Sequence, residues 1–198
     1  KANNYKGIIF TGGPNSVYDM KSPHYTKEIL ELGIPVLGIC YGCQLIAWMC
    51  DGVVKTAPVS EYGKIEVTVK DSLLFKGIPE KSVVWMSHTD YIAQPPEHFE
   101  VVGCSKDCPC AAMQYPEKGI YAVQFHPEVN HTEYGRQILK NFLYSVCKIE
   151  ERWSIGNFVT ESVEKIRKRV GDGKVLCALS GGVDRAVAAA LVHKALGN

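Results

Sequence analysis

Short, mainly apolar runs bounded by glycine or proline recur along the first two thirds of the chain, and each has the length of a buried β-strand. Three of them predict strands of a central sheet: Lys6–Phe10, Ile34–Ile39 and Gly119–Phe125. Between the first two, Ser22 and Pro23 fit the cap and first position of a helix that runs to Leu32 and stops at Gly33. This β-α unit leads directly into the second strand.

A different pattern separates the second and third of these strands. Lys64–Lys70 alternates polar and apolar residues, as a half-exposed strand does. Further short runs, separated by turn residues and proline, follow at Val83–Met86, Glu100–Gly103 and Ala111–Gln114. We expect a largely antiparallel excursion before the chain returns to the central sheet.

The last third of the chain predicts helices with one strand among them. Thr132–Cys147 has apolar residues at helical spacing, as a helix that closes an α/β layer does. The helices Thr160–Val170 and Ala186–Leu196 follow, with a strand over Lys174–Leu179 between them. We therefore expect one domain over residues 1–147, a charged linker over 148–159 and the start of a second domain over 160–198.

Composition and charge narrow the class of protein. The chain has 198 residues, of which 46% are hydrophobic and 22% charged, and its formal net charge is +1. This balance gives no field that would attract nucleic acid or an anionic membrane. No apolar run reaches the length of a membrane span and the N-terminus lacks a secretory pattern, so we expect a cytoplasmic protein whose eight cysteines are reduced.

The strongest candidate for chemistry is the break between the run Ile34–Ile39 and the helix-like run that begins near Gln44. The spacing Gly38-x-Cys40-x-Gly42 is that of a nucleophile elbow with cysteine in place of serine. The small residues allow a strained strand-to-helix turn, and the N-terminus of the helix stabilises a thiolate. Cys40 is the candidate nucleophile; the alternative is a buried cysteine flanked by turn glycines.

A candidate base follows the strand Gly119–Phe125. His126 and Glu128 flank Pro127, which ends the strand and fixes the local direction of the chain. His126 could take the thiol proton and return it to a leaving amine. Glu128 could orient the imidazole and stabilise its protonated form, so that the three side chains would divide the work as in a hydrolase triad.

Three segments together resemble the class I (triad) glutamine amidotransferases: Phe10–Pro14, Pro35–Gly42 with Gln44, and Gln124–Glu128. The resemblance covers residues 6–147. It implies an α/β, flavodoxin-like fold with a mostly parallel central sheet and an antiparallel excursion. It also implies hydrolysis of glutamine to glutamate and ammonia by Cys40, His126 and Glu128.

The same resemblance assigns residues to the oxyanion and to glutamine. Backbone N–H groups of the turn after Phe10 can point at an oxyanion, and the family places the N–H groups of Gly13 and Tyr41 there. Other glutamine contacts are implied for Gly12, Gln44, Ser87 and His88. The glycine turn could equally be an ordinary loop, and His88 a structural loop histidine.

Leu179–Asp184 resembles the pyrophosphate-binding loop of ATP pyrophosphatase domains, which belong to the adenine-nucleotide α-hydrolase-like folds. The implied ATP-binding residues are consecutive: Ser180, Gly181, Gly182, Val183, Asp184, Arg185 and Ala186. Arg185 stands where that loop usually carries serine, so we expect crowding of the phosphate site.

Amidotransferases with this second domain use ATP and Mg²⁺ to adenylate xanthosine monophosphate, which ammonia converts to GMP with release of AMP and pyrophosphate. The resemblance therefore implies glutamine, ATP and xanthosine monophosphate as substrates and a homodimer formed by a region absent here. It also implies further elements before Lys1 and after Asn198. The alternatives are a triad amidotransferase that serves another synthetase, and a non-catalytic module.

Cys104, Cys108 and Cys110 suggest a metal site by their proximity in the sequence. Structural zinc usually takes four ligands in paired spacing, which these residues lack. We expect no metal at this segment.

Overall fold

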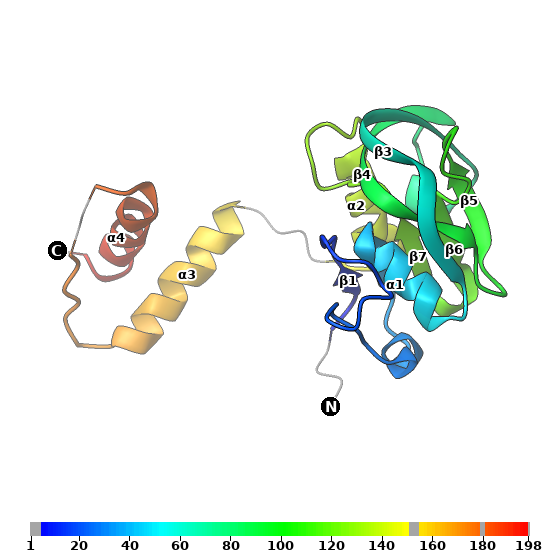
Figure 1. Cartoon of the computed structure of the whole chain (residues 1–198). Coiled ribbons are helices and arrows are strands. Elements are labelled where there is room, and N and C mark those ends of the chain that lie inside the picture. Colours follow the sequence, from blue (N-terminus) through cyan, green and yellow to red (C-terminus); the bar gives the residue numbers. More distant parts are fainter. Residues whose placement is uncertain (1–4, 151–154, 179–180, 198) are drawn as a thin grey trace. The chain divides into compact units, whose positions relative to one another are not determined.

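The computed structural model describes residues 5–150, 155–178 and 181–197. The chain divides into two compact units, Lys1–Glu150 and Glu151–Asn198, which are described separately (Figure 1). Among the described residues, no helix is both long enough and apolar enough to cross a membrane.

The first unit is built on one mixed sheet flanked by helices (Figure 1). Its elements, in chain order, are β1 (Ile8–Phe10), β2 (Val36–Ile39), α1 (Tyr41–Met49), β3 (Val53–Val69), β4 (Lys81–Gln94), β5 (Glu100–Cys104), β6 (Ala112–Tyr115), β7 (Ile120–Val123) and α2 (Gly135–Lys140). Short 3-10 helices occur at Lys27–Glu31, Leu73–Phe75 and Pro116–Lys118, and a π-helical segment at Asn141–Val146 continues α2.

The seven strands lie in the order β1-β2-β7-β6-β5-β3-β4. β1, β2 and β7 pair in parallel, whereas β7-β6, β6-β5, β5-β3 and β3-β4 pair antiparallel. The α/β class and the antiparallel excursion are therefore confirmed. The sheet is mixed rather than mostly parallel, because the excursion pairs directly with β7 and continues the same sheet.

Alternate residues of the parallel strands face two hydrophobic cores. Leu37 of β2 and Tyr121 of β7 pack in the core that contains Phe142 from the segment after α2. Val36 and Ile120, their neighbours in the chain, pack on the opposite face with the residues of α1. β2 and β7 are thus buried on both faces, which explains their continuous apolar runs.

Two predicted helices differ from the observed elements. The helix predicted from Ser22 to Leu32 is a 3-10 helix over Lys27–Glu31, because the Ser22 hydroxyl donates to the Ser16 carbonyl, 2.5 Å away, instead of capping a helix. The predicted helix Thr132–Cys147 begins at Gly135 and becomes π-helical after Lys140. Thr132 itself is bonded to β4.

The second unit contains α3 (Ile155–Val170) and α4 (Val183–Leu196). Both helices begin earlier than predicted, so α3 occupies part of the predicted linker. The strand predicted at Lys174–Leu179 is wrong for residues 174–178, which are exposed and without regular structure; residue 179 lies outside the described residues. No strand of the described part of this unit lies beside them to supply the backbone hydrogen bonds that a strand requires.

Candidate active site

The turn between β2 and α1 has the backbone strain that a nucleophile elbow requires. Cys40 lies at φ 52° and ψ −108°, and its N–H donates to the Val123 carbonyl oxygen 2.9 Å away. A Cβ atom on Gly38 would lie 2.6 Å from the Gly42 carbonyl oxygen, and one on Gly42 would lie 2.3 Å from that of Phe10. Both glycines are therefore required by close backbone packing, and they hold Cys40 in a sparsely populated conformation.

His126 is fixed just beyond β7 by bonds to β4. Its N–H donates to the Trp85 carbonyl oxygen at 3.0 Å, and its carbonyl oxygen accepts from the Thr132 hydroxyl at 2.6 Å. The Trp85 N–H in turn donates to the Thr132 hydroxyl at 3.0 Å. The buried Thr132 therefore holds the backbone of His126 against the edge strand, a role that the sequence did not signal.

The three triad side chains lie together. His126 Nδ1 donates to Glu128 Oε1 at 2.7 Å, which leaves Nε2 for the thiol. The interaction with Cys40 raises the pKa of His126 to about 9; burial opposes the rise and the hydrogen bond to Glu128 supports it. At neutral pH the imidazole is therefore protonated, with a proton available for a leaving group.

The glycine turn after β1 packs against the same group. A Cβ atom on Gly12 would lie 3.0 Å from His126 Cε1 and 3.6 Å from Cys40 Cβ. One on Gly13 would lie 3.6 Å from Tyr41 Cγ. Tyr41 is the first residue of α1, so its N–H has no acceptor within the helix. Gly13 and Tyr41, whose N–H groups are the two predicted oxyanion donors, thus pack against each other, and Tyr41 directly follows Cys40.

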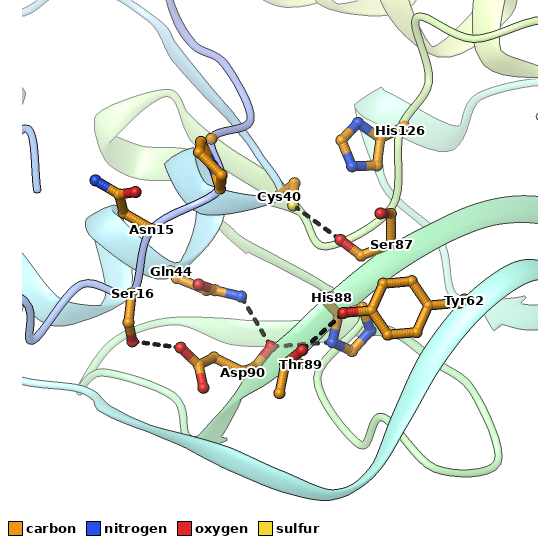
Figure 2. Close-up of a pocket in the computed structure, with 12 residues that line it drawn as sticks. Asn15, Ser16, Cys40, Gln44, Tyr62, Ser87, His88, Thr89, Asp90 and His126 are labelled. Carbon is orange, nitrogen blue, oxygen red and sulfur yellow. Dashed lines mark hydrogen bonds between the residues drawn. The ribbon is translucent and has the colours of Figure 1, made fainter.

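A cavity of about 560 Å³ opens at Cys40 (Figure 2). It is lined by residues from five parts of the first unit: Gly13, Pro14, Asn15, Ser16, Cys40, Gln44, Tyr62, Ser87, His88, Thr89, Asp90 and His126. The wall opposite α1 is the segment Ser87–Asp90 of β4. The Cys40 thiol donates to the Ser87 carbonyl oxygen at 3.7 Å, so the nucleophile faces this wall.

Several predicted glutamine contacts serve the wall itself. Gln44 is buried, and its Nε2 donates to the Asp90 carbonyl oxygen at 2.8 Å and to Gln124 Oε1 at 3.1 Å. Both ring nitrogens of His88 contact protein groups, at Asp90 and Glu61. Asp90 was not predicted from the sequence, and its carboxylate accepts from the Ser16 hydroxyl and, at 3.0 Å, from that of Thr56.

The three clustered cysteines differ in environment. Cys104 is exposed, whereas Cys108 and Cys110 are buried, and burial raises the pKa of Cys110 to about 12. Potential ligand atoms of Cys108, Glu61 and His88 lie within 4.8 Å of one another. Both Glu61 oxygens and both His88 nitrogens already have hydrogen-bond partners within the protein. That the cysteine segment holds no metal stays a prediction.

The predicted ATP loop lies in the second unit, and Ser180 falls outside the described residues. Gly181 has φ +75° and Gly182 is the N-cap of α4. Val183, Asp184, Arg185 and Ala186 form the first turn of that helix, and Arg185 is exposed. A glycine turn thus precedes a helix N-terminus, which is the arrangement of many anion sites.

The fold and the cysteine elbow define a class of enzyme, and comparison with known proteins agrees with it. The family model of glutamine amidotransferase class-I matches residues 1–146. The chain belongs to this family, which confirms the resemblance seen in the sequence.

The relatives include GMP synthases. The chain is 56% identical over its full length to "GMP synthase [glutamine-hydrolyzing]" of Clostridium botulinum and 55% identical to that of Clostridium perfringens. It spans 39% of the length of each. A solved structure from Thermoplasma acidophilum, assigned to GMP synthase, is 32% identical with a TM-score of 0.64, and the match covers 74% of each chain.

Proposed function

We propose that this chain hydrolyses glutamine to glutamate and ammonia at Cys40 and supplies the ammonia to a GMP synthase reaction. The observation that carries the proposal is that Cys40, in an elbow conformation, and His126 line one cavity, with Glu128 hydrogen-bonded to His126. Family membership alone would not require these side chains to meet.

The proposed mechanism assigns a residue to each step. The Cys40 thiolate attacks the side-chain amide carbon of glutamine, and the N–H groups of Gly13 and Tyr41 stabilise the oxyanion. The His126 imidazolium donates its proton to the departing ammonia, which leaves a glutamyl thioester on Cys40. His126, now neutral, accepts a proton from water as that water attacks the thioester. The carbon–sulfur bond then breaks, which releases glutamate and regenerates the Cys40 thiolate beside the His126 imidazolium, and Glu128 orients the ring throughout.

The cavity suits an amino acid with a neutral, polar side chain. Among the described residues that line it, Asp90 carries the one carboxylate. It can bind the α-ammonium group of glutamine by a charge-assisted hydrogen bond while the amide reaches Cys40. The hydroxyl groups of Ser16, Tyr62 and Thr89 also line the cavity and offer hydrogen-bonding oxygens to the polar groups of the substrate.

The larger reaction requires more than this chain contains, since the chain spans about two fifths of its curated relatives. We infer that Ser180–Ala186 begins the site at which ATP, with Mg²⁺, activates xanthosine monophosphate. The glycine turn before α4 supports this inference, because backbone N–H groups at a helix start can bind pyrophosphate. Ammonia from the first unit would then give GMP, with AMP and pyrophosphate released by a homodimeric enzyme.

Replacement of the nucleophile tests the proposal. We expect Cys40→Ala to abolish glutamate release from glutamine, because no other group in the cavity can form the thioester. Cys50→Ala, at the C-terminal end of the same helix, is the matched control and should retain activity. In the complete enzyme, synthesis from free ammonia should survive Cys40→Ala. Glutamine-dependent activity in the Cys40 variant would refute the assignment.

A further inference from the structure

A second carboxylate–imidazole pair lies behind the cavity wall. Glu61 of β3 and His88 of β4 are opposite one another in the antiparallel register, and their side chains are 3% and 2% exposed. They face the core side of the strands, in line with Val84 and Met86, where an apolar residue would be usual. Burying a carboxylate beside an imidazole contributes little net stability, so the presence of this pair needs another explanation.

The pair is part of a continuous hydrogen-bonded chain. His88 Nε2 lies 3.1 Å from Glu61 Oε2, and Glu61 Oε1 accepts from the Ser105 hydroxyl at 2.6 Å. On its other side, His88 Nδ1 donates to the Asp90 carbonyl oxygen at 2.9 Å. Because a carbonyl oxygen can only accept, His88 Nδ1 carries a hydrogen, and this contact fixes how the ring is turned.

The series of hydrogen bonds from Ser105 through Glu61 and His88 reaches helix α1 at the Asp90 carbonyl oxygen. This oxygen accepts from His88 and also from Gln44 of α1, four residues after the nucleophile (Figure 2). Two buried donors from opposite sides therefore fix the peptide of Asp90. The same stretch of β4 presents its Ser87 carbonyl oxygen to the Cys40 thiol.

The local strand geometry makes the arrangement possible. The pairing of β3 with β4 shifts in register between Thr56 and Glu61. Such a bulge re-aims side chains and commonly lies next to active sites. Here it places Glu61 directly opposite His88, although Thr56 still pairs with Asp90.

We propose that Glu61 is a positioning residue for the glutamine site. It acts through His88 to hold the Ser87–Asp90 wall at a fixed distance from Cys40, and so sets the fit of the amino-acid end of glutamine. The inference rests on the proposed glutamine hydrolysis. It adds to the residues that determine glutamine recognition one that does not line the cavity. It predicts an effect on glutamine binding, with the reactivity of Cys40 unchanged.

The test compares four variants of the chain. Glu61→Ala removes the partner of His88, and Glu61→Gln keeps the shape and an acceptor. His88→Asn keeps a donor near the Asp90 carbonyl oxygen. Glu66→Ala, on the exposed side of the same strand, removes the same charge from a surface pair with Lys81 and is the matched control.

Three measurements separate binding from chemistry. These are KM and kcat for glutamate release, the Kd for glutamine by calorimetric titration in a Cys40→Ala background, and the rate of Cys40 alkylation by iodoacetamide. We expect Glu61→Ala to raise KM and Kd about tenfold, or ~1.4 kcal/mol, with kcat within about threefold and alkylation unchanged. Glu61→Gln and His88→Asn should recover most of the affinity, and Glu66→Ala should equal wild type.

Other results would overturn the proposal. If wild type binds glutamine and Glu61→Ala binds it equally well, Glu61 has no positioning role, although the proposed function stands. If kcat, alkylation and affinity fall together, the pair is merely structural. If Glu61→Ala does not fold, Ser105→Ala decides, because it removes one bond to Glu61 and should raise KM about twofold to threefold. Wild-type protein that neither binds nor hydrolyses glutamine would refute the proposed function itself.

Discussion

Two helices of this chain begin after a glycine-containing turn, and their surroundings differ. At α1, the flanking glycines Gly38 and Gly42 have backbone atoms 2.6 Å and 2.3 Å from where a Cβ would lie. At α4, nothing among the described residues lies within 4 Å of a Cβ on Gly181 or Gly182. The two turns are similar as sequence and different as packing.

The left-handed conformation also falls on different residues. In the first turn it is Cys40, at φ 52°, and in the second it is Gly181, at φ 75°. A left-handed non-glycine residue is strained by roughly 1–3 kcal/mol and persists only where the surrounding structure enforces it. Glycine has no such penalty. The elbow is therefore a geometry that packing imposes, whereas the second turn needs no enforcement.

The largest expected difference is in stability, when one glycine of each turn is replaced by alanine. We expect Gly42→Ala to destabilise the first unit by about 3 kcal/mol or more, because its Cβ would overlap the Phe10 carbonyl group and overpacking of a core is rarely relieved. Gly182→Ala, at φ −77°, should change stability by less than about 0.5 kcal/mol. Urea denaturation followed by circular dichroism measures both.

A Gly42→Ala protein as stable as wild type would show that the elbow can relax. A strongly destabilised Gly182→Ala protein would show that the second turn is packed as tightly as the first. Either result would remove the contrast.

The contrast also explains what the sequence could predict. The triad depended on short-range rules: Gly38-x-Cys40-x-Gly42 fixes a turn, and Pro127 fixes the exit from β7. Parallel strands β2 and β7 then bring Cys40 and His126 together because they are neighbours in the sheet. Short sequence patterns were sufficient to predict the triad because glycine and proline fix the backbone next to Cys40 and His126.

The parts that escaped prediction depend on contacts distant in sequence. Glu61 reads as one more polar residue near an alternating strand, and only its register with His88 makes it a buried partner. Thr132 read as the start of a helix, yet its hydroxyl is bonded to β4. Ser22 read as a helix cap, yet it bonds to a carbonyl of the preceding turn. In each case a tertiary hydrogen bond replaced the local one.

The elbow differs from the second turn in facing an imidazole held by a carboxylate, which gives a prediction on pH. His126 has a pKa raised to about 9, and Glu128 contributes to that rise. Activity that needs the imidazolium is therefore present below pH 9 and lost as the pH rises through that value. Glu128→Gln should lower the pKa of His126 and move the alkaline limb of kcat/KM, which reports the free enzyme, to lower pH.

The rates should follow the same order. We expect the loss in kcat from Glu128→Gln to be roughly a hundredfold smaller than that from His126→Ala, as orienting acids are less critical than bases in a triad. Profiles of kcat and kcat/KM between pH 6 and 10 measure both the rates and the position of the alkaline limb. A more damaging change at Glu128, or an alkaline limb that stays in place, would mean that the roles are assigned wrongly.

The smallest expected effect is a change in kcat that distinguishes two consecutive glycines of the first unit, Gly12 and Gly13. A Cβ on Gly12 would lie 3.0 Å from His126 Cε1, closer than ordinary contact, whereas one on Gly13 would meet Tyr41 at an ordinary 3.6 Å. Gly12→Ala must therefore shift the imidazole by a few tenths of an ångström, and we expect kcat to fall about tenfold because reactive groups tolerate little misplacement.

Gly13→Ala keeps its backbone N–H, the proposed oxyanion donor, and should stay within about threefold of wild type. Steady-state glutamate release from the two variants at saturating glutamine measures the difference. Equal rates would show that His126 adjusts freely, and a greater loss at Gly13 would place the steric constraint at the oxyanion side instead.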